Sequence, residues 1–139
     1  MLNVLITVKA TQKTLGEPPQ IIEFTSEGKY YERMGAIFLV YEESELSGFP
    51  GHKTTLKIHE DHVTMRRYGA NTSSIHFEKG VREDSEYETP YGVFKLETLT
   101  HRLEMALTEV SGEVTIEYAL SIQGVHEAMH TLVISYRAI

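Results

Sequence analysis

The sequence predicts an all-β protein: one domain over residues 1–139, folded as a closed up-and-down antiparallel barrel of about eight to ten strands. Apolar and polar residues alternate along most of the chain, short turns separate the alternating segments, and no segment carries the hydrophobic period of an amphipathic helix. An even number of sequential antiparallel strands brings the first and last strands side by side. Pairing those two strands removes both exposed sheet edges.

The clearest alternation lies between Glu113 and Ala138. One face of this stretch collects Val114, Ile116, Tyr118, Leu120 and Ile122, and the pattern returns after residues 124–127 with Leu132, Ile134 and Tyr136. A period of two predicts a pair of half-buried antiparallel strands. Roughly ten residues at about 3.3 Å each span about 33 Å, a length typical of a barrel wall.

The N-terminal third predicts three strands, at residues 3–10, 21–33 and 36–43. Residues 11–20, between the first two strands, are predicted to be a loop that ends in Pro18-Pro19. Proline has no amide hydrogen to donate to a strand ladder. Gly28 predicts a bulge or bend in the second strand, and Met34-Gly35 predicts a tight turn. The loop after the third strand, residues 44–53, is rich in glycine and proline and contains Gly48.

Two short connections set the register of three central strands. A turn at residues 60–61 places Arg67 opposite Thr54, and a loop at residues 69–71 continues the register into the next strand. One face then collects Lys57, His59, His62, Thr64, Arg66, Ser74, His76 and Glu78, and the other collects Leu56, Ile58, Val63, Met65, Ile75 and Phe77. Such complete sorting predicts that the second face points into the barrel and the first points outward.

The last third predicts a polar, irregular connection over residues 80–88 and a further strand over residues 93–100. A turn at Ser111-Gly112 would place Leu107 opposite Ile116 on the next strand.

Composition restricts the class of partner. The 139 residues are 41% hydrophobic and 24% charged, with a net charge of −7 and no cysteine. The negative charge argues against a nucleic-acid partner. The lack of cysteine excludes disulfides and cysteine-bound metals and fits a cytoplasmic protein. No run approaches the roughly 18 apolar residues of a membrane span, and residues 1–8 lack a basic flank and so read as a strand rather than a signal peptide.

The chain resembles the YwiB-like bacterial proteins, a domain of unknown function with a lipocalin-like, calycin-type barrel. The residues that carry this resemblance are Tyr41-Glu42-Glu43, Gly51, Thr54-Thr55-Leu56-Lys57-Ile58, Arg67, Gly69, Phe77-Glu78, Gly80, Thr89-Pro90-Tyr91-Gly92, Gly112, Tyr118 and Leu120. They extend over nearly the whole chain. The resemblance implies a cytosolic bacterial protein, from a Gram-positive organism, and calycin barrels commonly hold small apolar ligands.

The best candidate site lies at one rim of the expected barrel, where Tyr41, Glu42, Thr54, Arg67 and Tyr68 come together at strand ends. The register points Arg67 inward, and an inward arginine costs several kcal/mol unless it is paired. We expect Glu42 to be its partner. The guanidinium, with Tyr41 or Tyr68 nearby, could then hold the anionic head of a small ligand. The alternative is a rim ion pair that only ties strands together.

No catalytic residue, cofactor or metal site is predicted. The chain has no G-x-S-x-G elbow, P-loop or H-E-x-x-H motif. Histidine and glutamate could carry out acid–base chemistry, but no arrangement of them in the sequence indicates a catalytic site. His59, His62, His76 and Glu78 could in principle bind zinc, but a solvated outer face explains them without a metal. Tyr91 either lines a pocket or, as we expect, packs against the barrel floor.

Two hypotheses for function follow. In the first, the protein is a non-enzymatic barrel that binds a small apolar or amphiphilic ligand, which requires a cavity of a few hundred Å³. In the second, it is a protein-interaction or scaffold barrel with a filled core, and a possible homodimer. The outward-facing apolar residues Leu5, Val93, Leu99 and Val133 would then form the contact surface.

Overall fold

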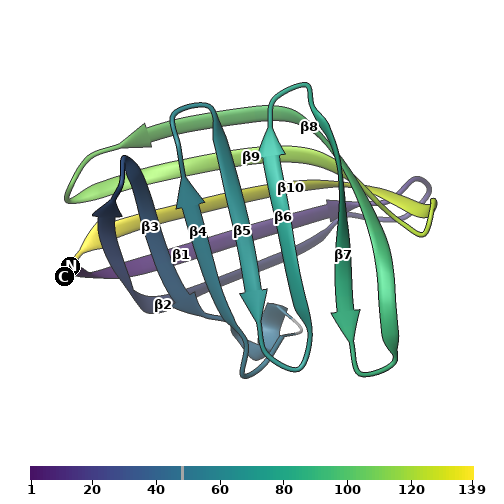
Figure 1. Cartoon of the computed structure of the whole chain (residues 1–139), viewed down its shortest axis with the longest axis horizontal. Coiled ribbons are helices and arrows are strands. Elements are labelled where there is room, and N and C mark those ends of the chain that lie inside the picture. Colours follow the sequence, from purple (N-terminus) through teal and green to yellow (C-terminus); the bar gives the residue numbers. More distant parts are fainter. Residues whose placement is uncertain (48) are drawn as a thin grey trace.

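The computed structural model describes residues 1–47 and 49–139, and within this range the side chains of Ser47 and His126 are left out. Gly48, in the predicted loop, lies outside the described residues. The described part forms a closed antiparallel barrel of ten strands (Figure 1). The strands are β1 Leu2–Lys13, β2 Gln20–Arg33, β3 Ala36–Glu42, β4 Lys53–Ile58, β5 His62–Tyr68, β6 Thr72–Glu78, β7 Arg82–Thr89, β8 Gly92–Leu107, β9 Ser111–Ile122 and β10 Val125–Ala138. A short 3₁₀ helix, η1, spans Glu45–Ser47.

Closure joins the first strand to the last, as predicted. β1 pairs with β10 from Val4↔Ala138 to Lys13↔Met129, and the two chain ends lie side by side (Figure 1). The amide of Ile139 also donates to the carbonyl of Asn3 at 3.1 Å. Each described strand has a paired neighbour on both sides, so the sheet is closed, although β6 and β7 pair over only two residues each. In the described part of the chain, no helix is long and apolar enough to cross a membrane.

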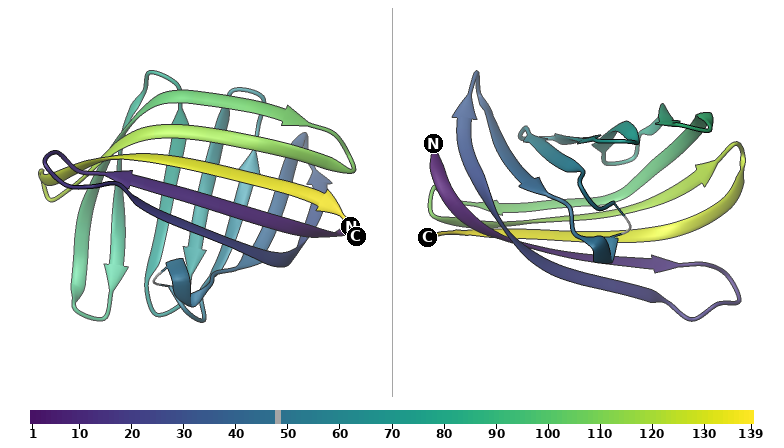
Figure 2. Two further views of the ribbon diagram at one scale, coloured as in Figure 1. Left: turned by 180° about the vertical axis from the view of Figure 1, so that it is seen from behind. Right: turned by 90° about the horizontal axis from the view of Figure 1, so that it is seen from below.

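The barrel is flattened into two layers whose strands cross at a steep angle. β1, β8, β9 and β10 run along the length of the molecule, and β3 to β7 cross in front of them (Figures 1 and 2). β2 and β8 bend from one layer into the other and so form the two corners (Figure 1). Strands that bend or bulge at a corner are the usual way for a sheet to pack on itself in this manner.

Gly28 lies at the β2 corner, where pairing passes from β1 to β3. It lies opposite Val4 on one side and Tyr41 on the other, and neither pairing contains a bulge. Of the two predicted possibilities, a bulge or a bend, the structure therefore has the bend. A Cβ at this position would lie 2.4 Å from the carbonyl oxygen of Val40 and 2.5 Å from Cδ1 of Ile6. Only glycine therefore allows the layers to approach this closely.

The β8 corner contains a bulge between Thr100 and Arg102 on the β9 side.

The turn from β8 into β9 comes earlier than predicted, because Thr108 Oγ1 accepts the amide of Ser111 at 3.1 Å and closes the turn with its own side chain. Leu107 therefore lies opposite Gly112, and the predicted pairing of Leu107 with Ile116 is wrong.

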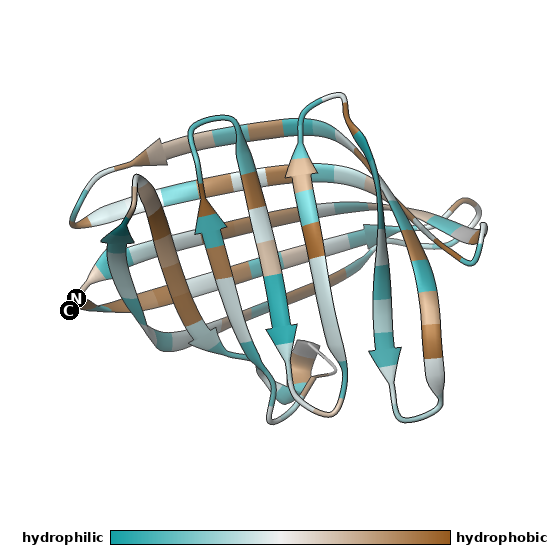
Figure 3. Cartoon of the chain, in the orientation of Figure 1, coloured by the Kyte–Doolittle hydropathy of each residue, from teal (hydrophilic) through white to brown (hydrophobic). Residues whose placement is uncertain are grey.

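Residues 80–88 were predicted to be irregular, but Arg82–Thr89 form β7, which pairs with β8 along its whole length. Figure 3 shows almost no apolar banding on this strand, so its alternation carried no hydrophobic signal. Inward-facing β7 residues are Glu83, Ser85 and Tyr87. On its other side the register pairs only Thr72 with Glu88 and Ser73 with Tyr87, among the described residues of β6 and β7.

The barrel interior is filled at one end and hollow at the other. Away from the cavity the packed side chains include Val4, Ile6, Leu39, Val63 and Ile134, all fully buried. The predicted inward face of β4 to β6 is confirmed, as is the register of Arg67 opposite Thr54. At the far end, where the β1–β2 and β9–β10 turns lie (Figure 2), the strands enclose a cavity.

The packing at Gly28 predicts that Gly28→Ala lowers the free energy of unfolding by about 1–3 kcal/mol, because the added methyl group must displace backbone or a packed isoleucine. Urea unfolding followed by circular dichroism measures this. Glu27→Ala, on the exposed neighbour in the same strand, is the matched control and should change stability by less than about 0.5 kcal/mol. Equal stability of both variants would show that the corner is not tightly packed.

Candidate functional site

The interior cavity has a volume of about 320 Å³. Its described lining residues come from every strand except β4 and from the β3–β4 loop. Most of the wall is apolar and includes Val8, Ile22, Phe24, Leu96, Leu120 and Ile122. The polar part includes Tyr41, Glu43, Arg67, Tyr118 and His130. A partly open, mainly apolar cavity with a few convergent polar groups has the character of a small-molecule site.

Arg67 is anchored to the barrel wall by a carboxylate and an aromatic ring. Its Nη2 donates to Oε1 of Glu43 at 3.2 Å, and the same oxygen accepts the hydroxyl of Thr54 at 2.6 Å. The guanidinium lies 4.0 Å from the ring centroid of Phe49, a cation–π contact. The Glu43 side chain is only 2% exposed and that of Arg67 is 19% exposed. This pair is therefore largely shielded from water.

The partner of Arg67 is Glu43, and the prediction of Glu42 is wrong. Glu42 is exposed, because β3 turns Leu39, Tyr41 and Glu43 inward and leaves Phe38 outside. Both faces of β3 are apolar, so periodicity alone did not distinguish them. The outward placement of Phe38 is stabilised by stacking on Tyr31, with ring centroids 4.8 Å apart.

The loop that carries Phe49 is held in place by His52, which is buried. His52 Nε2 accepts the amide of Asn71 at 3.0 Å, so the ring proton sits on Nδ1, which donates to the carbonyl of Pro50 at 3.1 Å. His52 also packs edge-on against Phe49, at 5.4 Å between centroids. It thus ties the β3–β4 loop to the β5–β6 loop and holds Phe49 over the guanidinium.

The wall opposite Glu43 carries Tyr118 and His130, whose rings stack in parallel with centroids 5.1 Å apart. Burial raises the pKa of Tyr118 to about 12, with a smaller opposing effect from the charge of Arg67. Burial lowers the pKa of His130, and burial, followed by the nearby Glu43, raises that of Tyr41. These groups are therefore neutral near pH 7, and they offer hydrogen bonds rather than charge.

Of the five predicted site residues, the structure brings together Tyr41, Thr54 and Arg67. Tyr41 and Arg67 line the cavity, and Thr54 is fully buried behind them and holds Glu43. Tyr68 is 45% exposed and faces outward, because it neighbours an inward residue in an extended strand. Glu42 also faces away.

Several site residues were not predicted, namely Glu43 as the ion-pair partner, Phe49, His52, Tyr118 and His130. His130 could have been found, because it continues the inward series Leu132, Ile134 and Tyr136 by one step towards the preceding turn. Phe49 and His52 lie in a loop without periodicity, and their positions depend on contacts with a distant segment.

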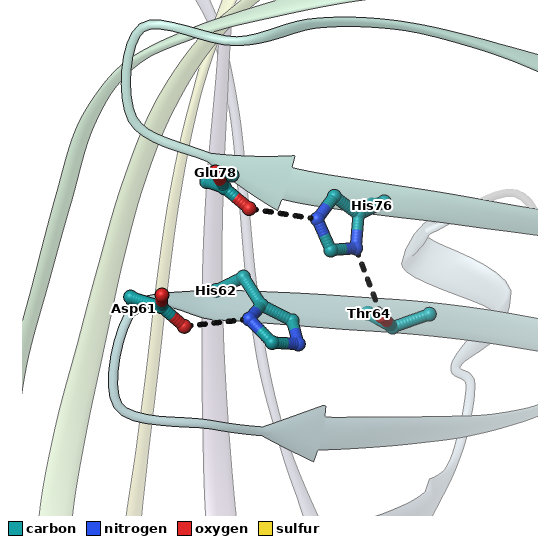
Figure 4. A network of polar contacts seen from close by, with 5 residues as sticks. All are labelled: Asp61, His62, Thr64, His76 and Glu78. Carbon is teal, nitrogen blue, oxygen red and sulfur yellow. Dashed lines mark hydrogen bonds and ion pairs between the residues drawn. The ribbon is translucent and has the colours of Figure 1, made fainter.

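The outer-face histidines form a separate cluster. His62 bonds to Asp61 through Nδ1 at 2.7 Å, and His76 contacts Thr64 and Glu78, each at 3.3 Å (Figure 4). The ring of His62 also lies 4.3 Å from that of His59 and 4.8 Å from that of His76. The rings stack instead of converging. Among the side chains that the structure describes, no group of three or more has the arrangement to hold a metal ion.

Tyr91 was expected to pack against the barrel floor, but it is 94% exposed. Thr89 Oγ1 accepts the amide of Tyr91 at 3.1 Å and donates to the carbonyl of Gly92 at 3.0 Å. Gly92 adopts φ +138°, a conformation that side chains rarely adopt. The turn is thus closed on itself and projects the tyrosine into solvent.

The fold and the cavity define the class of protein: a closed antiparallel barrel with a partly hollow interior. The chain belongs to the family described as a domain of unknown function (DUF1934), which matches residues 6–134. It is 30% identical over 118 residues to the uncharacterized beta-barrel protein YwiB of Bacillus subtilis (strain 168), covering 84% of this chain and 81% of the relative. The crystal structure of ywiB protein from Bacillus subtilis matches with a TM-score of 0.89 and 26% identity, over 99% of this chain and 92% of that chain. The resemblance drawn from the sequence is confirmed.

Burial of His130 predicts a pH dependence of stability. The unfolded histidine takes up a proton near pH 6.5, whereas the folded one does so only at lower pH. Between these values the unfolded state binds more protons, so stability falls as the pH falls. His130→Phe should lose less free energy of unfolding than the wild type between pH 7.5 and 5.5, by urea titration. His101→Gln, at an exposed histidine, should retain the wild-type loss, and an unchanged loss in His130→Phe would contradict the assignment.

Proposed function

We propose that the protein is a non-enzymatic binding barrel that holds a small apolar or amphiphilic molecule in its cavity, with the polar end of the ligand at Arg67. The observation that carries this proposal is the cavity of about 320 Å³, whose apolar wall ends at a guanidinium. Arg67 is half-buried and is held by Glu43 and Phe49, and a polar group fixed in this way beside an apolar cavity supports recognition of the polar end of a ligand. The alternative explanation of the pair as a strand tie leaves the void beside it without a purpose.

The size of the cavity limits the ligand. About 320 Å³ lies at the lower end of the range of small-molecule pockets, which begins near 300 Å³. A chain of about ten carbons, or a compact ring system of similar bulk, is the expected scale. Calycin barrels, the type implied by the sequence resemblance, commonly hold molecules of this character, an analogy at the level of fold. The same proposal places the protein in a bacterial cytoplasm, consistent with the lack of cysteine.

Ligand binding is tested with N-phenyl-1-naphthylamine, an uncharged dye that fluoresces in apolar sites, and its displacement by decanol. We expect micromolar binding of both, abolished in Leu120→Trp because the indole fills the cavity. Arg67→Ala should weaken decanol by about tenfold or more, since a hydrogen bond to a charged group contributes about 1.5–3 kcal/mol. Arg66→Ala, on the adjacent exposed arginine of the opposite face, should leave both affinities unchanged.

A second test is native mass spectrometry of the protein purified from its own host, which should show a bound small molecule.

No dye binding, together with no co-purified molecule, would contradict the binding barrel. A loss of thermal stability in Arg67→Ala without any change in affinity would show that the arginine is structural.

A second candidate function is a protein-interaction barrel that forms a homodimer, and the β7–β8 turn favours it. Tyr91 is 94% exposed there, and Val93 is 56% exposed beside it, whereas Leu5, Leu99 and Val133 are half-buried on the wall. Exposed apolar residues grouped on a turn are candidates for a contact surface.

The homodimer predicts a dimeric mass in sedimentation equilibrium at about 0.1 mM protein. It also predicts a shift to monomer in the double variant Tyr91→Ser/Val93→Ser, because the apolar contact is removed. Leu15→Ser, at a fully exposed leucine on the β1–β2 turn, is the matched control and should remain dimeric. A monomeric wild type at this concentration would exclude this surface as a homodimer contact.

A further inference from the structure

The charges that line the cavity cancel. Among the described lining residues, the titratable groups are Tyr41, Glu43, Arg67, Tyr87, Tyr118 and His130. Tyrosine is neutral near pH 7, and His130 is kept neutral by burial. Glu43 and Arg67 carry opposite charges and bond to each other at 3.2 Å. The one cation available to a ligand is therefore already neutralised by the protein.

Glu43 is held against its partner by hydrogen bonds of its own side chain and backbone. Its Oε1 accepts the hydroxyl of Thr54 at 2.6 Å, and its own amide donates to the carbonyl of His52 at 2.8 Å. The side chain is only 2% exposed, so swinging out would require the rim to open. Phe49 covers the guanidinium at 4.0 Å and holds the other half of the pair. A ligand thus meets a preformed ion pair rather than a free cation.

This arrangement decides the class of head group, and the inference rests on the proposed function. We propose that the cavity selects amphiphiles with an uncharged hydrogen-bonding head, such as an alcohol or amide, and that it accepts a carboxylic acid only in its protonated form. A second carboxylate beside Glu43 would place two anions against one cation in a site sheltered from water, which is costly. An uncharged oxygen can accept a hydrogen bond from Arg67 and adds no charge to bury.

The expectation from the sequence, that Arg67 binds the anionic head group of a ligand, assumed that the positive charge of Arg67 is not already neutralised by the protein. Because Thr54 and Arg67 converge on the same oxygen of Glu43, the charge of Arg67 is compensated before a ligand arrives, although its Nε has no hydrogen-bond partner among the described residues. Removing the charge of Glu43 while keeping its shape should therefore reverse the preference of the site. That reversal distinguishes recognition by an ion pair from recognition by a cation.

The test compares decanol, decanamide and decanoate, with N-phenyl-1-naphthylamine displacement on the full chain. At pH 7.5 we expect wild-type protein to bind decanol and decanamide at least tenfold more tightly than decanoate. As the pH falls towards 5, the affinity for decanoate should rise and that for decanol should not. In Glu43→Gln, decanoate at pH 7.5 should gain at least tenfold relative to decanol. Glu42→Gln removes a neighbouring exposed charge and should leave the ratio unchanged.

Calorimetry of decanoate binding in two buffers of different ionisation enthalpy measures proton uptake by the wild type directly, and it decides the matter even where Glu43→Gln does not fold. Uptake of close to one proton at pH 7.5 supports the inference. Decanoate that binds as tightly as decanol without proton uptake overturns it and leaves the proposed function standing. Failure of the dye and of all three ligands to bind would instead overturn the proposed function, and this inference with it.

Discussion

The unbroken ring of strand pairing is the constraint on which the rest of the structure depends. Once β1 has paired with β10, every strand has a neighbour on each side and a fixed register against it. A one-residue slip anywhere would turn the inward residues of that strand outward. The ring therefore determines both what fills the interior and which side chains meet at its open end. The register sets Thr54 opposite Arg67, and the packing of β3 turns Glu43 inward to meet both, so that three separate segments supply the group.

The interior is packed at one end of the barrel and hollow at the other. Near the chain termini Val4, Ile6 and Ile134 are fully buried and packed, and this packing supplies apolar burial that stabilises the fold. At the other end the wall residues stay apart around a cavity. A void costs stability wherever it occurs in a core. The void lies at the end of the barrel that also holds the ion pair of Glu43 and Arg67.

At each corner of the barrel one strand bends so that it can belong to both layers. β2 bends at a glycine that has no room for a side chain, and β8 bends at a bulge. These devices let strands of 14 and 16 residues belong to both layers. The crossing of the layers flattens the barrel (Figure 2). The stacked rings of Tyr118 and His130 form the wall opposite Glu43.

The sequence by itself determined the class of fold, the closure of β1 on β10, the inward face of β4 to β6 and the position of Arg67, because alternation and short turns are local and strong signals. Tertiary structure alone decided the rest. β7 lacks apolar alternation and is a strand because β8 pairs with it. β3 is apolar on both faces, so the choice of Glu43 over Glu42 was made by packing and by the stacking of Phe38 outside. The cavity, and the loop that His52 holds over it, arise from contacts between segments distant in sequence, which no local pattern records.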